Sequence, residues 1–413
     1  MATIRPFRAV RPNTSVADRV AALPYDVYNR SEAKTETERE PLSFLCIDRA
    51  ETQFDDSVDI YADEVYKKAD ELYHARKADG TFIMEEKPCY YIYELTMDSR
   101  SQTGIVGCAS VDDYMNNIIK KHENTRADKE ADRIRHVDSL SAQTGPIFLA
   151  YKAREDINKI IAKVKRTPAL YDFASPDGII HRAWIIDNDD DMDVIRKAFE
   201  ATDSIYIADG HHRCASAVRV GTMRRRKYSE YTGAEEFNYF LSVLFADEEL
   251  MIMDYNRVVK DLNNYTAAEI LAELSKLGKV TEIGNKAYKP EHKGEVGVFL
   301  ENTWYKFEYA DNLKSDDPVD GLDVAILQNN VLKPIFGIED PKTDKRIDFV
   351  GGIRGLGELE RRVHSDCRIA FAMYATGIDE LFKVADAGLL MPPKSTWFEP
   401  KLRSGLFIHE IER

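Results

Sequence analysis

Apolar residues recur along this chain at two spacings, and each spacing predicts a different kind of element. Between residues 59 and 79 they return every three or four positions, which is typical of one buried face of a helix. Shorter apolar runs that end at turn residues are typical of strands. Helices are expected at 31–40, 59–79, 156–164, 267–277 and 322–332. Strands are expected at 41–47, 89–95, 104–111, 146–151, 238–245, 296–300 and 304–307.

One further strand-like run leads directly into a polar turn. The apolar segment 205–208 stops at an Asp-Gly pair, and two histidines and an arginine follow before helix-compatible residues resume. Glycine permits a tight backbone there, and the start of a helix offers unpaired amides and positive partial charge to an anion. The candidate site residues in this turn are Asp209, Gly210, His211, His212 and Arg213.

The chemistry of these side chains favours a phosphate site. Imidazoles transfer protons near neutral pH and a guanidinium neutralises negative charge. A simpler interpretation stays open, in which the polar residues only cap the helix and face water. An open α/β sheet nevertheless builds its sites where buried strands end in this way.

The length and composition indicate a globular protein of more than one domain. We expect an α/β (α+β) fold with an N-terminal α/β domain at 1–245, which contains the phosphate or nucleotide site. A C-terminal α+β domain at 246–413 is expected to pack back on it. The chain has 72 acidic and 57 basic residues, a net charge of −15, which disfavours general nucleic-acid binding. No signal peptide or membrane span is evident, so we expect a cytoplasmic protein; its oligomeric state stays open.

A second group of polar residues follows residue 120. If the segment is helical, His122, Arg126, Lys129 and Arg133 fall at three- and four-residue spacings and share a basic stripe that can bind phosphate or carboxylate. The alternative is an exposed helix with intrahelical ion pairs. The candidate site residues in this segment are His122, Glu123, Thr125, Lys129 and Arg133.

The sequence favours magnesium over zinc as a metal partner. His122-Glu123 begins like a zinc-protease motif, but position 126 is Arg where a second histidine is required. The acidic run 187–193 lacks the glycine and closing glutamate of a calcium loop and is expected to cap a helix. Mg²⁺ needs only one or two carboxylates besides substrate phosphates, so Asp209 or Glu123 could hold it, and Asp209 is the expected ligand. No haem or flavin signal is present.

Four motifs together resemble domain-of-unknown-function family 1015, a family labelled SpoOJ- or ParB-like. The resemblance covers nearly the whole chain. Its motifs are Pro24-Tyr25-Asp26-Val27, His122-Glu123-Asn124-Thr125, Asp209-Gly210-His211-His212-Arg213 and Pro393-Lys394-Ser395-Thr396-Trp397-Phe398-Glu399-Pro400-Lys401.

The turn at residues 209–213 is also similar to the phosphate turn of the ParB/sulfiredoxin superfamily, which includes free-serine kinases. This resemblance implies a ParB/sulfiredoxin-like nucleotide-binding core, elaborated with additional mixed sheet and helices, and ADP or ATP as ligand. Sulfiredoxins place a catalytic cysteine where this chain has His211, so sulfinic-acid reduction is not expected.

These observations lead to a hypothesis of phosphoryl transfer, or phosphate-ester hydrolysis, on a small metabolite such as serine or phosphoserine. Asp209, His211, His212 and Glu123 are the expected catalytic residues. Phosphate or substrate is expected to contact Gly210, Arg213, His122, Thr125, Lys129, Arg133 and Lys394. Two alternatives stay open: a regulatory protein that binds a nucleotide or metabolite without chemistry, and a ParB-like DNA-binding protein, which the net charge disfavours.

Overall fold

The computed structural model describes residues 1–125, 127–228 and 230–412, without the side chains of residues 127–129. It consists of two compact units, Met1–Leu250 with Pro400–Arg413, and Met251–Glu399. The domain boundary expected between residues 245 and 246 stays a prediction. The last residues of the chain group with the first unit rather than the second.

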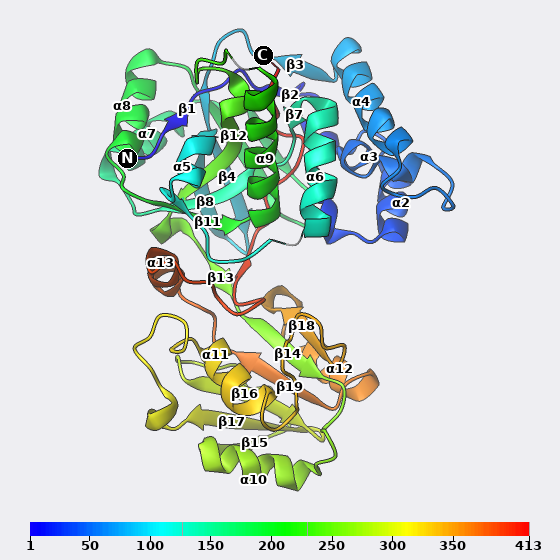
Figure 1. The fold of residues 1–413 in the computed structure, drawn as a ribbon, viewed down its shortest axis with the longest axis vertical. Helices are drawn as coiled ribbons and strands as arrows, with labels where there is room; N and C mark the ends of the chain where they lie inside the picture. The colour runs from blue at the N-terminus through cyan, green and yellow to red at the C-terminus, as the bar shows by residue number, and fades with distance from the viewer. Residues whose placement is uncertain (126, 229, 413) are drawn as a thin grey trace. The chain divides into compact units, whose positions relative to one another are not determined.

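Within the described residues, the first unit contains a nine-stranded mixed sheet in the order β6-β11-β8-β12-β5-β4-β10-β9, with β1 beside β5 (Figure 1). Its strands are β1 Ile4–Arg5, β4 Tyr90–Met97, β5 Arg100–Ser110, β6 Ile119–Lys120, β8 Ile147–Tyr151, β9 Tyr171–Ala174, β10 Ile180–Ile186, β11 Ile205–Asp209 and β12 Tyr239–Ala246. Two small ladders pair β2 Val10–Pro12 with β3 Phe82–Met84, and β7 Ala142–Gln143 with β21 His409–Glu410.

The central strands of this sheet form both antiparallel and parallel pairs. β4 and β5 form the expected antiparallel hairpin, with Tyr93 opposite Gly104. β12 pairs antiparallel with β5 and parallel with β8. β11 pairs antiparallel with β8 and parallel with β6, so the carboxyl ends of β6 and β11 meet at one edge. This shared edge is where the polar turn begins.

The helices of the first unit pack in two apolar clusters, one of them against the nine-stranded sheet. The α-helices of this unit are α1 Ala17–Val20, α2 Arg30–Arg39, α3 Leu45–Asp48, α4 Asp63–Ala78, α5 Val111–Met115, α6 Ala127–Leu140, α7 Glu155–Val164, α8 Asp189–Glu200 and α9 His211–Lys227. The 3-10 turns are η1 Tyr25–Val27, η2 Ala50–Gln53, η3 Glu236–Asn238 and η4 Asp247–Glu249. Residues of α7, α8 and α9 share one apolar core with the sheet, and α6 packs beside α9 (Figure 1). In the second cluster, α2, α3 and α4 pack with β2 and β3.

The second unit contains a six-stranded antiparallel sheet in the order β15-β17-β16-β19-β14-β18 within the part of the chain described. The strands of this sheet are β14 Tyr255–Val259, β15 Gly278–Gly284, β16 Glu295–Leu300, β17 Thr303–Tyr309, β18 Ile347–Gly351 and β19 Ile369–Met373. A separate ladder pairs β13 Ile252–Met253 with β20 Trp397–Phe398. The helices of the second unit are α10 Ala267–Leu277, η5 Asp311–Leu313, α11 Asp323–Leu327, the π-helical turn η6 Gln328–Leu332, η7 Gly352–Arg354, α12 Leu356–Ser365 and α13 Ile378–Asp386.

The observed elements confirm the α/β (α+β) class, with one correction. Residues 41–47 do not form the expected strand: a turn at 41–44 leads into the single helical turn α3. Residues 44–47 are all buried, and a short run that is apolar on every side does not distinguish a strand from a buried helix. The acidic run before α8 does cap that helix, since the Asn188 side chain accepts a hydrogen bond from the Asp191 amide.

None of the helices in the described chain combines the length and the apolar composition that a membrane crossing needs.

The packing of α9 depends on a glycine in the middle of the helix. A Cβ atom at Gly221 would lie 2.5 Å from the Phe237 carbonyl oxygen. Gly221→Ala should therefore destabilise the protein by about 1–3 kcal/mol, although alanine is the better helix former. Gly357→Ala in α12 is the control, because a Cβ there meets nothing within 4 Å and should be neutral or stabilising. Thermal unfolding followed by calorimetry tests both, and equal effects would contradict this packing.

Candidate functional site

The turn between β11 and α9 is built around one glycine. Gly210 has φ +90°, a left-handed conformation that favours glycine, and α9 begins at the next residue, so the N-cap position has no side chain of its own. A Cβ at Gly210 would lie 3.1 Å from Nε of Arg213. The turn therefore needs glycine both for its backbone angle and for the guanidinium that packs against it.

The parallel pairing of β6 with β11 brings the second motif to this turn. Ile119 pairs with Ile205 and Lys120 with Tyr206, so the chain leaves both strands at the same edge. The rings of His122 and His211 consequently lie 4.5 Å apart between centroids, at 88° to each other. The fold thus brings together two motifs that lie more than 80 residues apart in the sequence, and their shared role in a site stays a prediction.

His122 does not lie on a helix, so the expected basic stripe is wrong in this respect. Residues 121–125 are a loop, and α6 begins at Ala127. The loop geometry is needed for the chain to cross from the end of β6 to α6. Arg133 lies on α6, whereas Arg126 and the Lys129 side chain lie outside the described residues.

Both imidazoles are buried, and each has a ring nitrogen without a hydrogen-bond partner among the described residues: Nδ1 of His122 and Nε2 of His211. Burial lowers the pKa of His122 to about 4, although Asp209 and a hydrogen bond with the Ile207 backbone partly oppose the shift. Burial, reinforced by His122, lowers the pKa of His211 well below its usual value. Both rings are therefore neutral at neutral pH, with lone pairs available to a proton donor.

Asp209 is ionised and faces two cations. Its Oδ1 accepts a hydrogen bond of 2.8 Å from the Gly210 amide, and Nζ of Lys401 lies 3.1 Å from Oδ2. Burial alone would raise the pKa of Asp209, but Lys401 and Arg213 outweigh it and hold the pKa well below its usual range. The carboxylate keeps its charge because this local balance favours it.

Arg213 joins the turn to the start of β8. Its NH1 donates a 2.6 Å hydrogen bond to the Pro146 carbonyl oxygen, and a Cβ at Gly145 would lie 3.6 Å from the same NH1. This contact fixes the guanidinium beside the opening of α9. The guanidinium therefore adds positive charge at the helix N-terminus, which by itself already favours an anionic ligand.

The remaining expected residues of the turn and its loop have polar surroundings. Oγ1 of Thr125 donates to Oε2 of Glu130 over 3.1 Å, and Oγ of Ser216 donates to the carbonyl oxygen of His212 over 2.7 Å. Glu123 and His212 are half-buried and take part in further contacts. Their catalytic roles stay predictions.

Lys394 belongs to the second unit. Its ammonium lies 5.6 Å from the centre of the Tyr255 ring, and its carbonyl oxygen accepts a 3.0 Å hydrogen bond from NH2 of Arg257. The expected contact with phosphate stays a prediction for this residue.

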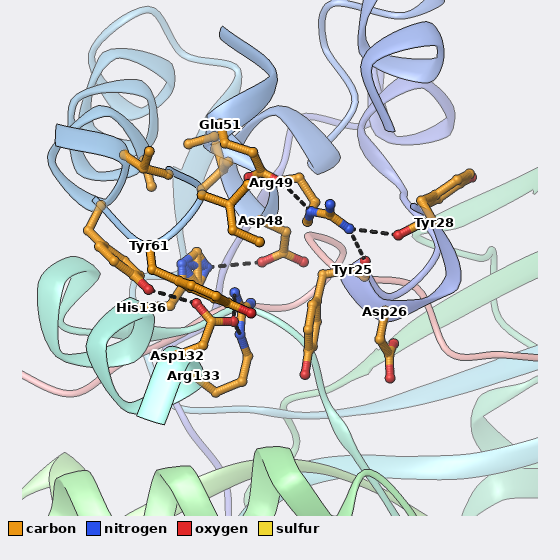
Figure 2. A pocket seen from close by; sticks show the side chains of 16 residues that line it. Tyr25, Asp26, Tyr28, Asp48, Arg49, Glu51, Tyr61, Asp132, Arg133 and His136 are labelled. Atoms are coloured by element: carbon orange, nitrogen blue, oxygen red, sulfur yellow. Dashed lines mark hydrogen bonds and ion pairs between the residues drawn. The ribbon is translucent and has the colours of Figure 1, made fainter. Parts of the chain in front are cut away.

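Two adjoining cavities lie near the turn within the first unit. The larger, here called the Tyr25 cavity, has a volume of about 180 Å³ and is lined by residues of η1, α3, η2, α4 and α6 (Figure 2). The smaller, of about 30 Å³, is lined by Arg213 and is called the Arg213 cavity. The two share Tyr25, Asp48, Arg133 and His136. Arg133, expected at the site, therefore lies on the wall between them.

Hydrogen bonds and ion pairs fix that wall. The Arg133 guanidinium stacks 3.8 Å from the centre of the Tyr25 ring, and its NH2 lies 2.8 Å from Oδ2 of Asp132. Oδ1 of Asp48 lies 3.1 Å from Nε2 of His136. Burial lowers the pKa of His136 to about 3, with Arg133 acting in the same direction, and burial raises the pKa of Asp48.

Sequence reasoning missed several residues that the fold brings to this region. Lys401 stands in the C-terminal motif, yet nothing in the sequence places it beside Asp209. Arg49 donates to the carbonyl oxygens of Tyr25 and Tyr28 over 3.0 and 2.7 Å and holds η1 in place. The sequence motif that contains Tyr25 and Asp26 pointed to η1, whereas no pattern in the sequence pointed to Arg49.

Asp209 is the expected ligand for Mg²⁺. Among the described residues, no three His, Cys, Asp or Glu side chains gather in a group able to hold a metal ion. A magnesium ion bound by one carboxylate and by ligand phosphates does not require such a group. Asp209 fits that minimal arrangement if the ion shares or replaces Lys401.

The fold and the site define a mixed α/β protein with a polar strand-to-helix turn at a sheet edge. The chain belongs to the family described as protein of unknown function (DUF1015), whose model matches residues 4–325. No curated protein matches the sequence.

Solved structures with similar folds were also found. A free serine kinase variant in complex with AMP has 15% identity and a TM-score of 0.36, over 73% of this chain and 92% of the kinase. SbnI from Staphylococcus aureus, truncated at its C-terminus, has 11% identity and a TM-score of 0.39, over 72% and 85%. A conserved hypothetical protein from Pyrococcus furiosus has 16% identity and a TM-score of 0.34, over 74% and 94%. These likenesses assign no activity to this chain.

The neutral imidazole of His122 predicts a pH dependence of stability. The folded-state pKa of about 4 lies below the value of about 6.5 in an unfolded chain, so between these values only the unfolded chain binds the proton. The free energy of unfolding should therefore fall on acidification from pH 6.5 to 4, by about 1.4 kcal/mol per pH unit for this histidine.

His122→Gln should reduce that slope in urea unfolding measured at several pH values. His74→Gln is the matched control, because the His74 side chain is 55% exposed and should leave the slope as in the wild type. Equal slopes for wild type and His122→Gln would show that His122 is not buried in the neutral form.

Proposed function

We propose that the turn at residues 209–213 binds a phosphate group and that the protein transfers or hydrolyses phosphoryl groups on a small metabolite. The observation that carries the proposal is the start of α9, where the N-cap is a left-handed glycine that has no side chain with which to cap the first amides. Arg213 and Lys401 place positive charge beside it. The first amides of a helix have no intrahelical partner, and together with nearby cations they favour an anion.

Asp209 is better suited to hold a cation than to accept a proton. A carboxylate whose pKa is held well below its usual range is a weak base. In this proposal Asp209 positions Lys401 and, when nucleotide is bound, Mg²⁺. The metal would supply neutralisation of phosphate charge.

The imidazoles supply the proton chemistry. His122 and His211 are neutral and have unpartnered ring nitrogens. An incoming phosphate would favour their protonated forms, because a nearby negative charge raises the pKa of an imidazole. His211 and His212, assisted by Glu123, then exchange protons with the reacting oxygens, and Arg213 offsets the charge that develops on phosphorus.

Thr125, Lys129 and Arg133 complete the proposed set of residues of the first unit that bind phosphate or substrate. Serine or phosphoserine is the proposed metabolite. Free serine kinase variants have been solved in complex with AMP and with ADP, which makes these nucleotides the first probes to use.

Phosphorus NMR of the protein with MgCl₂ tests the reaction, using serine plus ATP, serine plus ADP, and phosphoserine alone. We expect new phosphate signals in at least one mixture. Asp209→Asn should lower turnover about 100-fold or more while ligand binding stays measurable, because the cation loses its anchor. Asp203→Asn is the matched control, because Asp203 is exposed and precedes the same strand.

The outcomes separate the competing functions. If ADP or phosphoserine binds but no new phosphate signal appears, the protein is a regulatory binding protein and not an enzyme. Absence of binding to every probe, or normal turnover in Asp209→Asn, would contradict the phosphate site itself.

A further inference from the structure

The Tyr25 cavity has a charged lining that packing alone does not require. The Arg49 and Glu51 side chains form one ion pair and are 13% and 5% exposed. Those of Arg133 and Asp132 form another and are 9% and 12% exposed. Burying ion pairs costs desolvation energy, and apolar side chains of similar volume often stabilise a fold equally well. Charged groups kept around a cavity are instead typical of polar ligand recognition.

The balance of charge identifies which ion the cavity favours. Figure 2 shows the Arg49–Glu51 pair and the Asp132–Arg133 pair on either side of Asp48. Since His136 is neutral, four carboxylates face two guanidinium groups, 2 − 4 = −2. With Asp48 protonated the balance is still −1. The lining charges are those of Asp26, Asp48, Glu51, Asp132, Arg49 and Arg133.

The size of the cavity suits a small ligand. A cavity of about 10–15 Å³ already holds one water molecule, so about 180 Å³ has room for several groups of that size. A compound of the size of a small metabolite therefore fits.

We infer that the Tyr25 cavity binds a small hydroxylated compound that carries an ammonium group, an amino alcohol or a hydroxy amino acid. The net negative lining attracts the ammonium. Arg133, stacked on Tyr25, offers the guanidinium that recognises a carboxylate where the ligand has one. This identification rests on the proposed function, because the compound is its small metabolite and the shared wall leads to Arg213.

Asp26 is the lining residue at which a substitution should disturb the fold least while it tests ammonium recognition. It lines the cavity, yet it is exposed, so its amide variant should fold normally. Calorimetric titration of the wild type with ethanolamine, L-serine and D-glycerate separates the contributions of the ammonium and carboxylate groups. Ethanolamine and L-serine should bind at least about tenfold more tightly than D-glycerate, which lacks the ammonium. If ethanolamine binds more tightly than L-serine, the ligand of the cavity is an amino alcohol. If L-serine binds more tightly, the ligand is a hydroxy amino acid.

The variants locate the binding to this cavity. Asp26→Asn and Asp132→Asn should each weaken the tighter of the two ammonium ligands about tenfold, with ADP affinity unchanged. Asp56→Asn is the control, since that side chain is 73% exposed and lies outside the lining. Equal binding of D-glycerate, no binding of either ammonium compound, or unchanged affinity in both cavity variants would overturn the inference.

The same experiment keeps the two proposals apart. If ADP binds and the ammonium compounds do not, the inference fails while the phosphate site stands. If the ammonium compounds bind the wild type and lose affinity in the cavity variants, while no phosphate ligand binds, the phosphate site fails and this cavity keeps its ligand.

Discussion

The carboxylate of Asp209 is the interaction on which the site depends, because it joins the turn to the last residues of the chain. Lys401 reaches it across 192 sequence positions, and Arg213 adds a second positive charge. Without them, burial would raise the pKa of Asp209 above its usual value. Backbone hydrogen bonds between Ser404 and Ala22 hold the Lys401 segment in place, so the N- and C-terminal parts of the first unit support one carboxylate.

Much of the fold could be predicted from local pattern. The hairpin of β4 and β5, the bounds of α10 and the capped start of α8 follow from spacing and turn residues, which act over a few positions. Residues 41–47 could not be assigned correctly, because complete burial removes the periodicity that separates a strand from a helix. The return of residues 400–413 to the first unit depends on pairing across the whole chain, which local sequence does not encode.

The candidate site likewise has some residues that could be predicted from the sequence and others that could not. The sequence identified Asp209, His211 and His122 by their chemistry, and the parallel pairing of β6 with β11 explains why two of them meet. It did not identify Lys401 or Arg49 as contributors, because their parts follow only from tertiary contacts. The charged lining of the Tyr25 cavity comes from segments that are separate in the sequence, so its net charge could be counted only after folding.

The central claim is that the amides at the start of α9 receive a phosphate. A TROSY titration of perdeuterated, ¹⁵N-labelled protein with AMP tests it most directly. The largest amide shifts should fall at residues 210–213, whereas the start of α10 should be unaffected, because the Thr266 side chain already accepts a hydrogen bond from the Glu269 amide there. Shifts confined to other parts of the chain, or shifts of equal size at both helix starts, would contradict the account.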